Sequence, residues 1–503
     1  MADNYIKRIL EANVYDVAIE TPLSEAKFLS DRLGNQILIK REDKQPVYSF
    51  KCRGAYNCIS KKTPEQLAKG VVTASAGNHA QGVALSAQKL GIKATIVMPR
   101  TTPEIKVASV RARGARAVLH GDTFDEAFAH SQKLVEEKGM TYIHPYDDPD
   151  VIAGQGTIAM EILRQYSGPI HAIFVCVGGG GLAAGIAAYV KYLRPEIKVI
   201  GVESTESACL DAAMKAGRRV KLPHVGIFAD GVAVGQIGKH TWQVCKDHID
   251  EVITVTPDEL CAAIKDIFDD TRSVAEPAGA LGVAGLKKYV EQTGIEGETM
   301  VAIESGANVN FDRLRYISEM AEVGEKREVL MAVTIPEKPG SFKEFCNVLG
   351  KSTITEFNYR YGNSNEAQIY VGVKIAEGGK DELLNELKEK GYPVLDLSED
   401  DISKYHIRHM VGGHAPDAVD NEILYRFEFP ERPGALMVFL KKLGKRWNIS
   451  MFHYRNHGAA NGRVLAGIQV PKSEEPQFKQ FVKSLDYPCW EESDNPAYKL
   501  FLK

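Results

Sequence analysis

The sequence predicts an α/β body of catalytic size followed by two copies of a small α+β module. Between about residues 35 and 310, continuously apolar segments alternate with amphipathic helical patterns, which is typical of a parallel sheet covered by helices on both faces. After about residue 325 two segments repeat each other. The strands predicted in the first part are 37–40, 70–75, 93–99, 115–120, 171–177, 198–204 and 299–305. Ligands of such sheets bind beyond the carboxyl ends of the strands.

The repeat has an offset of 94 or 95 residues. IPEKPGSF at 335–342 aligns with FPERPGAL at 429–436, and FNYR at 357–360 aligns with FHYR at 452–455. Each copy reads as strand, PG turn, helix, two strands, helix and strand. We therefore predict a catalytic domain at 1–325, modules at 329–401 and 424–495, and a Gly- and Asp-rich linker at 412–422.

Composition excludes several classes of function. The 503 residues carry 62 Lys plus Arg against 66 Asp plus Glu, a net charge of −4, so no basic face for nucleic acid is expected. No apolar stretch approaches the roughly 20 residues that span a bilayer. The eight cysteines are scattered and show no zinc spacing, which favours a reduced, cytoplasmic protein without a metal site.

Lys51 is the first candidate for chemistry. It lies in PVYSFKCRGAY at 46–56, directly after the aromatic Phe50. An apolar neighbour disfavours the charged ammonium, and a neutral amine is the nucleophile of Schiff-base chemistry. Most lysines are solvated surface charges, so this segment alone leaves both interpretations open.

SAGNHAQG at 75–82 follows one predicted strand and precedes a helix. Small and polar residues at such a turn offer backbone N–H groups to a carboxylate. The alternative is an ordinary helix cap formed by Ser75 or Asn78. A cap needs only one such residue, so the density of Gly and polar positions favours an anion site.

VGGGGLAAG at 177–185 is the strongest phosphate signal, because four successive glycines after a buried strand exceed any packing requirement and let the backbone approach an anion. The same segment also fits a dinucleotide fingerprint through Gly178, Gly180 and Ala183, with Glu203 as the ribose-binding acid. A nicotinamide-dependent dehydrogenase therefore stays an alternative, although it leaves Lys51 unexplained.

Ser305, in ESGANVN at 304–310, follows the last predicted strand. Its hydroxyl is suitably placed to meet a ring nitrogen that lies over the strand ends. A serine in a turn is the plainer interpretation when the segment is taken alone.

Taken in order, SFKCRGA, SAGNHAQG, VGGGGLAAG and SGANVN resemble the motifs of fold-type-II pyridoxal-phosphate enzymes of the serine/threonine dehydratase group. With the two C-terminal modules, the chain from about residue 15 onward resembles the biosynthetic, feedback-regulated threonine deaminases. The resemblance implies pyridoxal 5'-phosphate as cofactor, with Lys51 bound to it and Phe50 beside its ring. It implies further cofactor contacts from Asn78, Gly178, Gly179, Gly180, Gly181, Leu182 and Ser305, and a substrate-carboxylate turn of Ser75, Ala76, Gly77, Asn78 and His79.

The resemblance also implies deamination of L-threonine to 2-oxobutanoate and ammonia, isoleucine as inhibitor, valine as antagonist and a homotetramer. The repeated modules resemble ACT-like amino-acid-sensing domains. Candidate effector residues are Gly340, Phe357, Tyr359 and Arg360 in the first module and Gly434, Phe452, Tyr454 and Arg455 in the second. An L-serine dehydratase or racemase, and a non-catalytic amino-acid sensor, are further alternatives.

Overall fold

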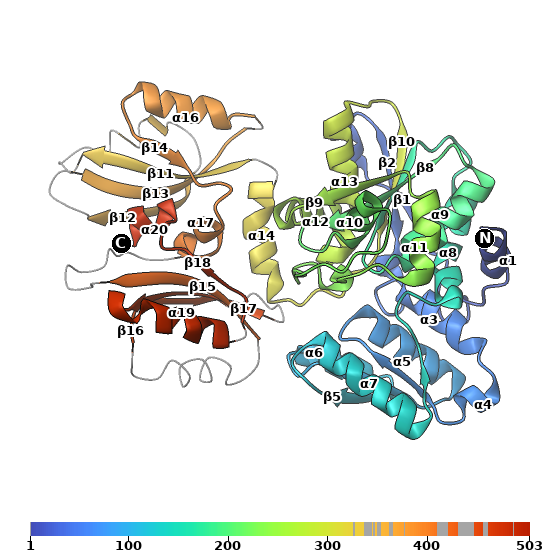
Figure 1. Ribbon diagram of the computed structural model, residues 1–503. Helices are drawn as coiled ribbons and strands as arrows, with labels where there is room; N and C mark the ends of the chain where they lie inside the picture. Colours follow the sequence, from blue (N-terminus) through green and yellow to red (C-terminus); the bar gives the residue numbers. More distant parts are fainter. Residues whose placement is uncertain are drawn as a thin grey trace. The chain divides into compact units, whose positions relative to one another are not determined.

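The computed structural model describes residues 2–324, 327–336, 345, 348, 349, 354–361, 366–376, 378–409, 421–430, 447–455, 461–485 and 487–502 (Figure 1). The chain forms two compact units, Met1–Ala321 and Glu322–Lys503, called unit 1 and unit 2 below. Each unit is described by itself.

Unit 1 contains a six-stranded sheet that is parallel except at one edge. Its order is β1 (Leu23–Glu25), β2 (Gln36–Arg41), β10 (Thr299–Glu304), β7 (Ala172–Cys176), β8 (Lys198–Ser204) and β9 (Glu251–Val255). Only β1 pairs antiparallel, against β2. Strand β7 is buried throughout and β10 is buried except at Thr299, as their continuous apolarity predicts.

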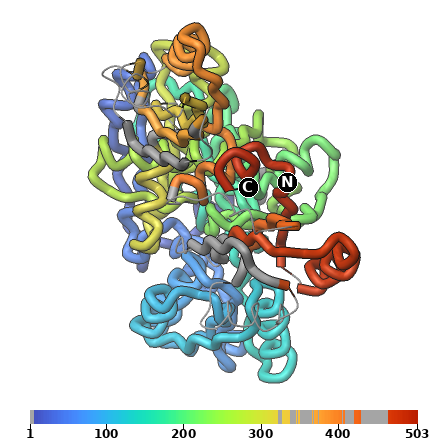
Figure 2. Tube along the Cα trace, turned by 90° about the vertical axis from the view of Figure 1, so that its left-hand side faces the viewer, coloured from blue at the N-terminus to red at the C-terminus, as the bar shows by residue number. Residues whose placement is uncertain are grey.

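A second sheet of unit 1 is parallel and has four strands. Its order is β5 (Arg116–Leu119), β4 (Ala94–Met98), β3 (Val71–Ala74) and β6 (Thr141–Tyr142). Both views show it with its helices as a lobe apart from the rest of unit 1, coloured light blue to cyan (Figures 1 and 2). The prediction that these strands belong to one sheet with the others is wrong, because strand patterns are local and do not say which strands pair.

Helices cover both sheets of unit 1. They are α1 (Ala2–Leu10), α2 (Lys27–Leu33), α3 (Lys51–Ser60), α4 (Pro64–Leu67), α5 (Asn78–Leu90), α6 (Glu104–Arg111), α7 (Phe124–Lys138), α8 (Pro149–Gln165), α9 (Gly181–Leu193), α10 (Cys209–Ala216), α11 (Lys239–His248), α12 (Pro257–Thr271), α13 (Pro277–Thr293) and α14 (Arg313–Gly324), with 3-10 turns η1 (Glu42–Lys44) and η2 (Asp230–Val232). Three of these helices begin inside predicted motifs: α3 at Lys51, α5 at Asn78 and α9 at Gly181.

Unit 2 contains two antiparallel sheets with the same strand order. The first is β12 (Ile354–Tyr361), β13 (Glu366–Lys374), β11 (Glu328–Pro336) and β14 (Val394–Asp396), and the second is β16 (Asn448–Arg455), β17 (Asn461–Gln469), β15 (Glu422–Pro430) and β18 (Cys489–Glu491). Helices α16 (Lys380–Glu389) and α19 (Glu475–Ser484) occupy equivalent places, and η4 (Lys472–Glu474) precedes α19. The predicted linker lies outside the described residues except for Asn421 and Glu422, and Glu422 already begins β15.

The repeat continues further than the aligned motifs indicated. Helix α17 (Asp401–Tyr405), which is followed by η3 (Ile407–His409), has its counterpart in α20 (Pro496–Phe501), and the preceding caps Asp400 and Asn495 are again 95 residues apart. Each cap accepts a hydrogen bond from its own helix, and Asn495 Nδ2 also donates to Asp400 Oδ1 at 3.1 Å.

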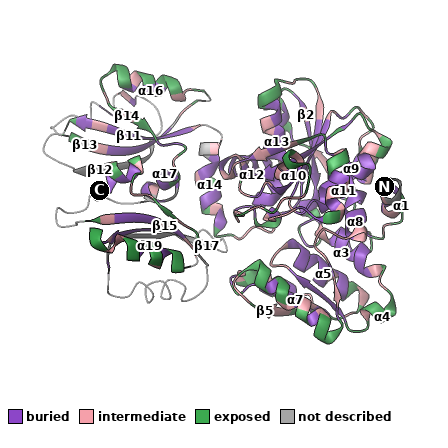
Figure 3. Ribbon diagram, in the orientation of Figure 1, coloured by how far each residue is buried: buried purple, intermediate pink, exposed green. Residues whose placement is uncertain are grey.

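The two modules share an apolar core in addition to their own. Along β11, Val329, Met331 and Val333 pack beneath α16, whereas the alternate residues Leu330 and Ala332 face a second cluster. That second cluster also contains Leu424 and Leu465 of the other module and Tyr498 and Phe501 of α20. Figure 3 shows buried residues along β11, β13 and β15, with α16 and α19 exposed on the outside.

None of the helices in the described part of the chain is long and apolar enough to cross a membrane. The described residues also contain no group of three or more His, Cys, Asp or Glu side chains placed to hold a metal ion. The cytoplasmic location stays a prediction.

Candidate active site

Lys51 is held at the start of α3 with its amine deep in unit 1. The residue as a whole is only partly buried, but its Nζ donates to the Pro145 carbonyl oxygen at 3.2 Å and lies 5.0 Å from the centroid of the Phe50 ring. Burial lowers the pKa of Lys51 to about 8, although Cys176 and Glu276 act in the opposite direction. A sizeable fraction of this amine is therefore neutral near pH 7 to 8, as nucleophilic attack requires.

The Ser305 loop lies directly beside the Lys51 segment. Ser49 forms an isolated bridge with Gly306, and Phe50 N donates to the Ser305 carbonyl oxygen at 3.3 Å. Ser305 is buried, and its hydroxyl donates to the Ala278 carbonyl at 3.3 Å. The structure thus brings together two motifs that are more than 250 residues apart in the chain.

The turn at 75–79 combines a cap with a buried amide. Ser75 Oγ accepts hydrogen bonds from Gly77 N and Ala80 N, both at 3.3 Å, so Ser75 caps α5 as the alternative interpretation expected. Asn78 is buried, donates from Nδ2 to Glu276 Oε1 at 2.5 Å and accepts from Asn308 Nδ2 at 2.7 Å.

His79 is part of the fold rather than a titrating group near neutral pH. Its Nε2 lies 3.1 Å from the Ile143 carbonyl oxygen. Burial, followed by the nearby Lys51 charge, lowers the pKa of His79 to about 3. The ring is therefore neutral at physiological pH.

The glycine loop opens α9 and is closely packed, contrary to our expectation. A Cβ at Gly178 would lie 2.8 Å from Val232 Cα, and one at Gly179 would lie 2.2 Å from the Tyr146 ring. Gly180 has φ +88, which favours glycine. The four glycines thus serve packing as well as backbone approach. Leu182 is buried in the first turn of α9, whose N-terminal N–H groups favour an anion.

Glu276 and the charges around it belong to no motif that the sequence singles out. Glu276 precedes Pro277 at the start of α13 and therefore looks like a helix cap, but its side chain makes no cap hydrogen bond. Burial, reinforced by Asp230, raises the pKa of Glu276 to about 7. Asp230 pairs with Lys106 at 2.6 Å and with Arg313 at 3.5 Å.

Glu203, the acid that made a dinucleotide site possible, is occupied elsewhere. Its two carboxylate oxygens accept hydrogen bonds from the backbone N–H groups of Leu210 and Asp211, each at 2.8 Å. The residue is fully buried. It caps α10 and presents no free carboxylate to a ribose. The dehydrogenase alternative therefore lacks the ribose-binding acid that the dinucleotide fingerprint requires.

Comparisons with known proteins now place this arrangement in a family. Residues 14–306 match the model of pyridoxal-phosphate dependent enzymes, and residues 319–407 and 414–502 each match the C-terminal regulatory domain of threonine dehydratase. The biosynthetic L-threonine dehydratase of Burkholderia multivorans is 57% identical over 503 residues, which cover 99% of each chain. The chain belongs to the biosynthetic threonine dehydratases. The resemblance inferred from the motifs, the fold class and the dependence on pyridoxal phosphate are confirmed.

Two similar solved structures match 64% and 62% of this chain. The processed form of threonine deaminase isoform 2 from Solanum lycopersicum is 52% identical, with a TM-score of 0.63, and the match covers 64% of this chain and 93% of that one. Maize serine racemase is 34% identical, with a TM-score of 0.59, and the match covers 62% and 95%. One fold therefore serves both elimination and racemisation.

The residues of unit 1 fit pyridoxal phosphate. The Lys51 amine has a lowered pKa, as a cofactor-binding lysine requires. The loop from Gly178 to Gly181 has no room for a Cβ at several positions and leads into a helix N-terminus, which suits a phosphate. Ser305 lies buried beside the Lys51 segment.

The effector candidates are described only in part. Gly340 and Gly434 lie outside the described residues. Phe357, Tyr359 and Arg360 lie on β12, and their backbones pair with Val371, Ile369 and Gln368 of β13. Phe452, Tyr454 and Arg455 occupy the equivalent positions of β16 against β17. The assignment of these residues to an effector site stays a prediction.

Proposed function

We propose that unit 1 converts L-threonine to 2-oxobutanoate and ammonia with pyridoxal phosphate, as the first committed step of isoleucine biosynthesis. The observation that carries this proposal is the contact of the Lys51 segment with the Ser305 loop, which in turn contacts Glu276, the partner of Asn78. The chain that makes these contacts belongs to the threonine dehydratase family. The catalytic domain we assign to this activity is 1–325.

The cofactor is held by residues from four segments. Lys51 would bind it covalently, Phe50 would lie beside its ring, Asn78 would contact its phenolic oxygen, and Ser305 would face its pyridine nitrogen. Its phosphate would be held by Gly178, Gly179, Gly180, Gly181 and Leu182. When bound, pyridoxal phosphate supplies a conjugated ring that accepts negative charge from the substrate α-carbon.

The protein's own groups bind the substrate and move its protons. The turn from Ser75 to His79 would hold the substrate carboxylate, and Lys51 Nζ would take the α-proton as general base. The lowered pKa of Lys51 suits this role, because the amine must be neutral to accept a proton. Loss of the β-hydroxyl as water then yields an enamine, and hydrolysis of that product consumes water and releases ammonia and 2-oxobutanoate.

A serine opposite the pyridine nitrogen favours elimination over transamination. A hydroxyl does not keep that nitrogen protonated as a carboxylate would, so the ring accepts less charge. The buried Ser305, rather than an acid, occupies this position in our assignment.

Unit 2 regulates this activity through the modules 329–401 and 424–495. Both modules match the regulatory domain of threonine dehydratase. We propose isoleucine as inhibitor, valine as antagonist and a homotetramer as the assembly in which the effectors act. An effector can act only by binding one state of the protein better than another.

A serine dehydratase or racemase is the second candidate, because maize serine racemase shares the fold at 34% identity. The two regulatory matches favour the biosynthetic deaminase. A non-catalytic sensor is less consistent with an intact Lys51 whose pKa is lowered.

The test is keto-acid formation from L-threonine, L-serine and D-serine by the purified protein, with borohydride fixation of the cofactor and mass spectrometry of the labelled peptide. We expect threonine to be the best substrate and Lys51 to carry the label. The Lys51→Ala variant should lose activity by at least about 10²–10⁴-fold while keeping its fold. Retained activity in that variant, or a label elsewhere, would refute the assignment.

A further inference from the structure

Arg53 is the second charged residue of the SFKCRGA motif, and the proposed chemistry gives it no role. It lies two residues after Lys51 in the first turn of α3. Two residues correspond to about 200° around a helix, so the two side chains leave α3 on opposite sides. Arg53 is completely buried, which is unusual for an arginine and requires partners.

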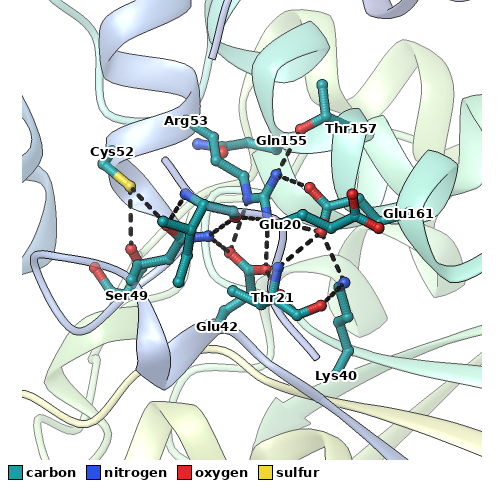
Figure 4. Close-up of polar contacts among 12 residues, drawn as sticks. Glu20, Thr21, Lys40, Glu42, Ser49, Cys52, Arg53, Gln155, Thr157 and Glu161 are labelled. Atoms are coloured by element: carbon teal, nitrogen blue, oxygen red, sulfur yellow. Dashed lines mark hydrogen bonds and ion pairs between the residues drawn. The ribbon is translucent and has the colours of Figure 1, made fainter. Parts of the chain in front are cut away.

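The guanidinium of Arg53 is bound on all three nitrogens (Figure 4). It forms paired contacts with Glu42 at 2.8 and 2.8 Å and with Glu161 at 2.5 and 3.0 Å. It also donates to Thr157 Oγ1 at 3.1 Å. Planar, paired contacts of this kind restrict orientation more strongly than a single point charge does.

The cluster around Arg53 is electrically balanced. Lys40 Nζ lies 2.7 Å from Glu161 Oε2, and the side chains of Arg53, Lys40, Glu42 and Glu161 are all fully buried. Two cations thus face two anions. Buried ion pairs of this kind often contribute little net stability compared with apolar side chains of the same volume. Orientation is therefore a better explanation of the cluster than stability.

Helix α8 joins this cluster to both parts of the candidate site. Glu161 and Thr157 lie on α8, and a Cβ at Gly154 would be 2.7 Å from Gly54 Cα of α3. On α9, a Cβ at Gly185 would be 2.7 Å from Gly156 N of α8. The backbone of α8 thus touches the helix that begins at Lys51 and the helix that begins at Gly181, with no side chain between them.

We propose that Arg53 is a positioning residue: clamped between Glu42 and Glu161, it fixes the rotation of α3 against α8 and so holds the Lys51 amine at a set place relative to the Gly178–Gly181 loop. The inference rests on the proposed role of Lys51. It requires that loss of the paired contacts of the Arg53 guanidinium displaces the Lys51 amine even when the protein still folds.

The test uses Arg53→Lys, which keeps the positive charge but loses the planar guanidinium and its paired hydrogen bonds to Glu42 and Glu161. Arg32→Lys is the matched control, because Arg32 pairs with the buried Asp266 at 2.7 Å in unit 1 and lies on α2 rather than on α3. Three quantities are compared: the thermal midpoint, the affinity of cofactor-free protein for pyridoxal phosphate, and the pH midpoint for chemical modification of Lys51 in cofactor-free protein.

We expect Arg53→Lys to weaken cofactor binding at least about tenfold and to raise the Lys51 midpoint towards that of a solvated lysine, about 10.4. Arg32→Lys should lower only the thermal midpoint. If Arg53→Lys lowers the thermal midpoint alone, as the control does, the positioning role is overturned.

Thr157→Val provides the second, milder variant in case Arg53→Lys does not fold. It removes one hydrogen bond to Arg53, and we expect a roughly two- to tenfold loss of cofactor affinity with a smaller shift of the Lys51 midpoint in the same direction. Unchanged affinity and midpoint would overturn the proposal. A wild-type protein that does not attach the cofactor to Lys51 would instead refute the proposed function. The pH midpoint for Lys51 modification would still show whether Arg53 positions the amine.

Discussion

Unit 1 and unit 2 build their interiors by different means. In unit 1, contacts between residues far apart in the chain position single side chains, such as Arg53 against Glu161 and Asn78 against Glu276. In unit 2, one pattern is used twice, with equivalent sheets, helices and caps and an apolar core shared between the modules. The difference indicates that a catalytic centre requires unique long-range contacts, whereas an amino-acid-sensing unit can be assembled by duplication.

Removing unit 2 has the largest expected effect and tests whether catalysis belongs to unit 1 and regulation to unit 2. A chain that ends after Gly324 keeps α14 complete, including Tyr316, whose ring packs against Phe228 of unit 1. We expect it to retain threonine deamination and to lose all inhibition by isoleucine, since regulatory couplings of roughly 1–3 kcal/mol disappear with the effector site. Keto-acid assays of the truncated and full chains, with and without isoleucine, give the answer. Persistent inhibition would place the effector site in unit 1.

Gly179→Ala tests whether the close packing of the glycine loop in unit 1 is needed for cofactor binding. The new Cβ would lie 2.2 Å from the Tyr146 ring, so the ring or the loop must move, and we expect cofactor affinity to fall at least about tenfold. Titration of cofactor-free protein with pyridoxal phosphate measures the loss. Gly235→Ala is the matched control, because its Cβ would meet only Val225 Cγ2, at an ordinary 3.4 Å. Equal affinities in the two variants would show that the loop does not hold the phosphate.

The pH dependence of cofactor attachment tests the buried amine of unit 1. Only a neutral amine attacks the aldehyde, and the pKa of Lys51 is lowered to about 8 by burial. Attachment should therefore speed up as the pH rises and level off above about pH 8, rather than above the roughly 10.4 of a solvated lysine. Stopped-flow absorbance on cofactor-free protein measures the rate. A midpoint near 10 would mean that the amine is hydrated.

Asn495→Ala should have the smallest effect and tests the duplicated pattern of unit 2. It removes the cap of α20 and the hydrogen bond to Asp400, at a cost of about 0.5–2 kcal/mol in the free energy of unfolding of unit 2. Denaturant unfolding of the chain, followed by a probe in unit 2, measures the change. Asn495→Asp keeps a capping oxygen but sets a carboxylate beside Asp400, so a loss equal to that of Asn495→Ala would mean that the bond between the modules matters more than the cap.

Much of the site follows from local patterns. Lys51, Asn78, the Gly178–Gly181 loop and Ser305 stand in motifs where strand, turn and helix signals are strong, and three of these motifs begin helices of the structure. The cap role of Ser75 and the close packing of Gly179 were the points where the preferred interpretation of a motif was incomplete or wrong. A motif shows which residue types are present but not which neighbour each of them contacts.

Hydrophobic periodicity, glycine runs and repeats are local properties of a chain, and they predict the α/β body, the order of its motifs and the duplication of the C-terminal module. No local pattern predicts that the strands of unit 1 form two sheets, that Glu276 meets Asn78 across 198 residues, or that Arg53 is clamped to Glu161 across 108 residues, and these features appear only in the folded chain. The physical reason is that buried polar groups must find partners, and close packing, not sequence distance, determines which partners they find.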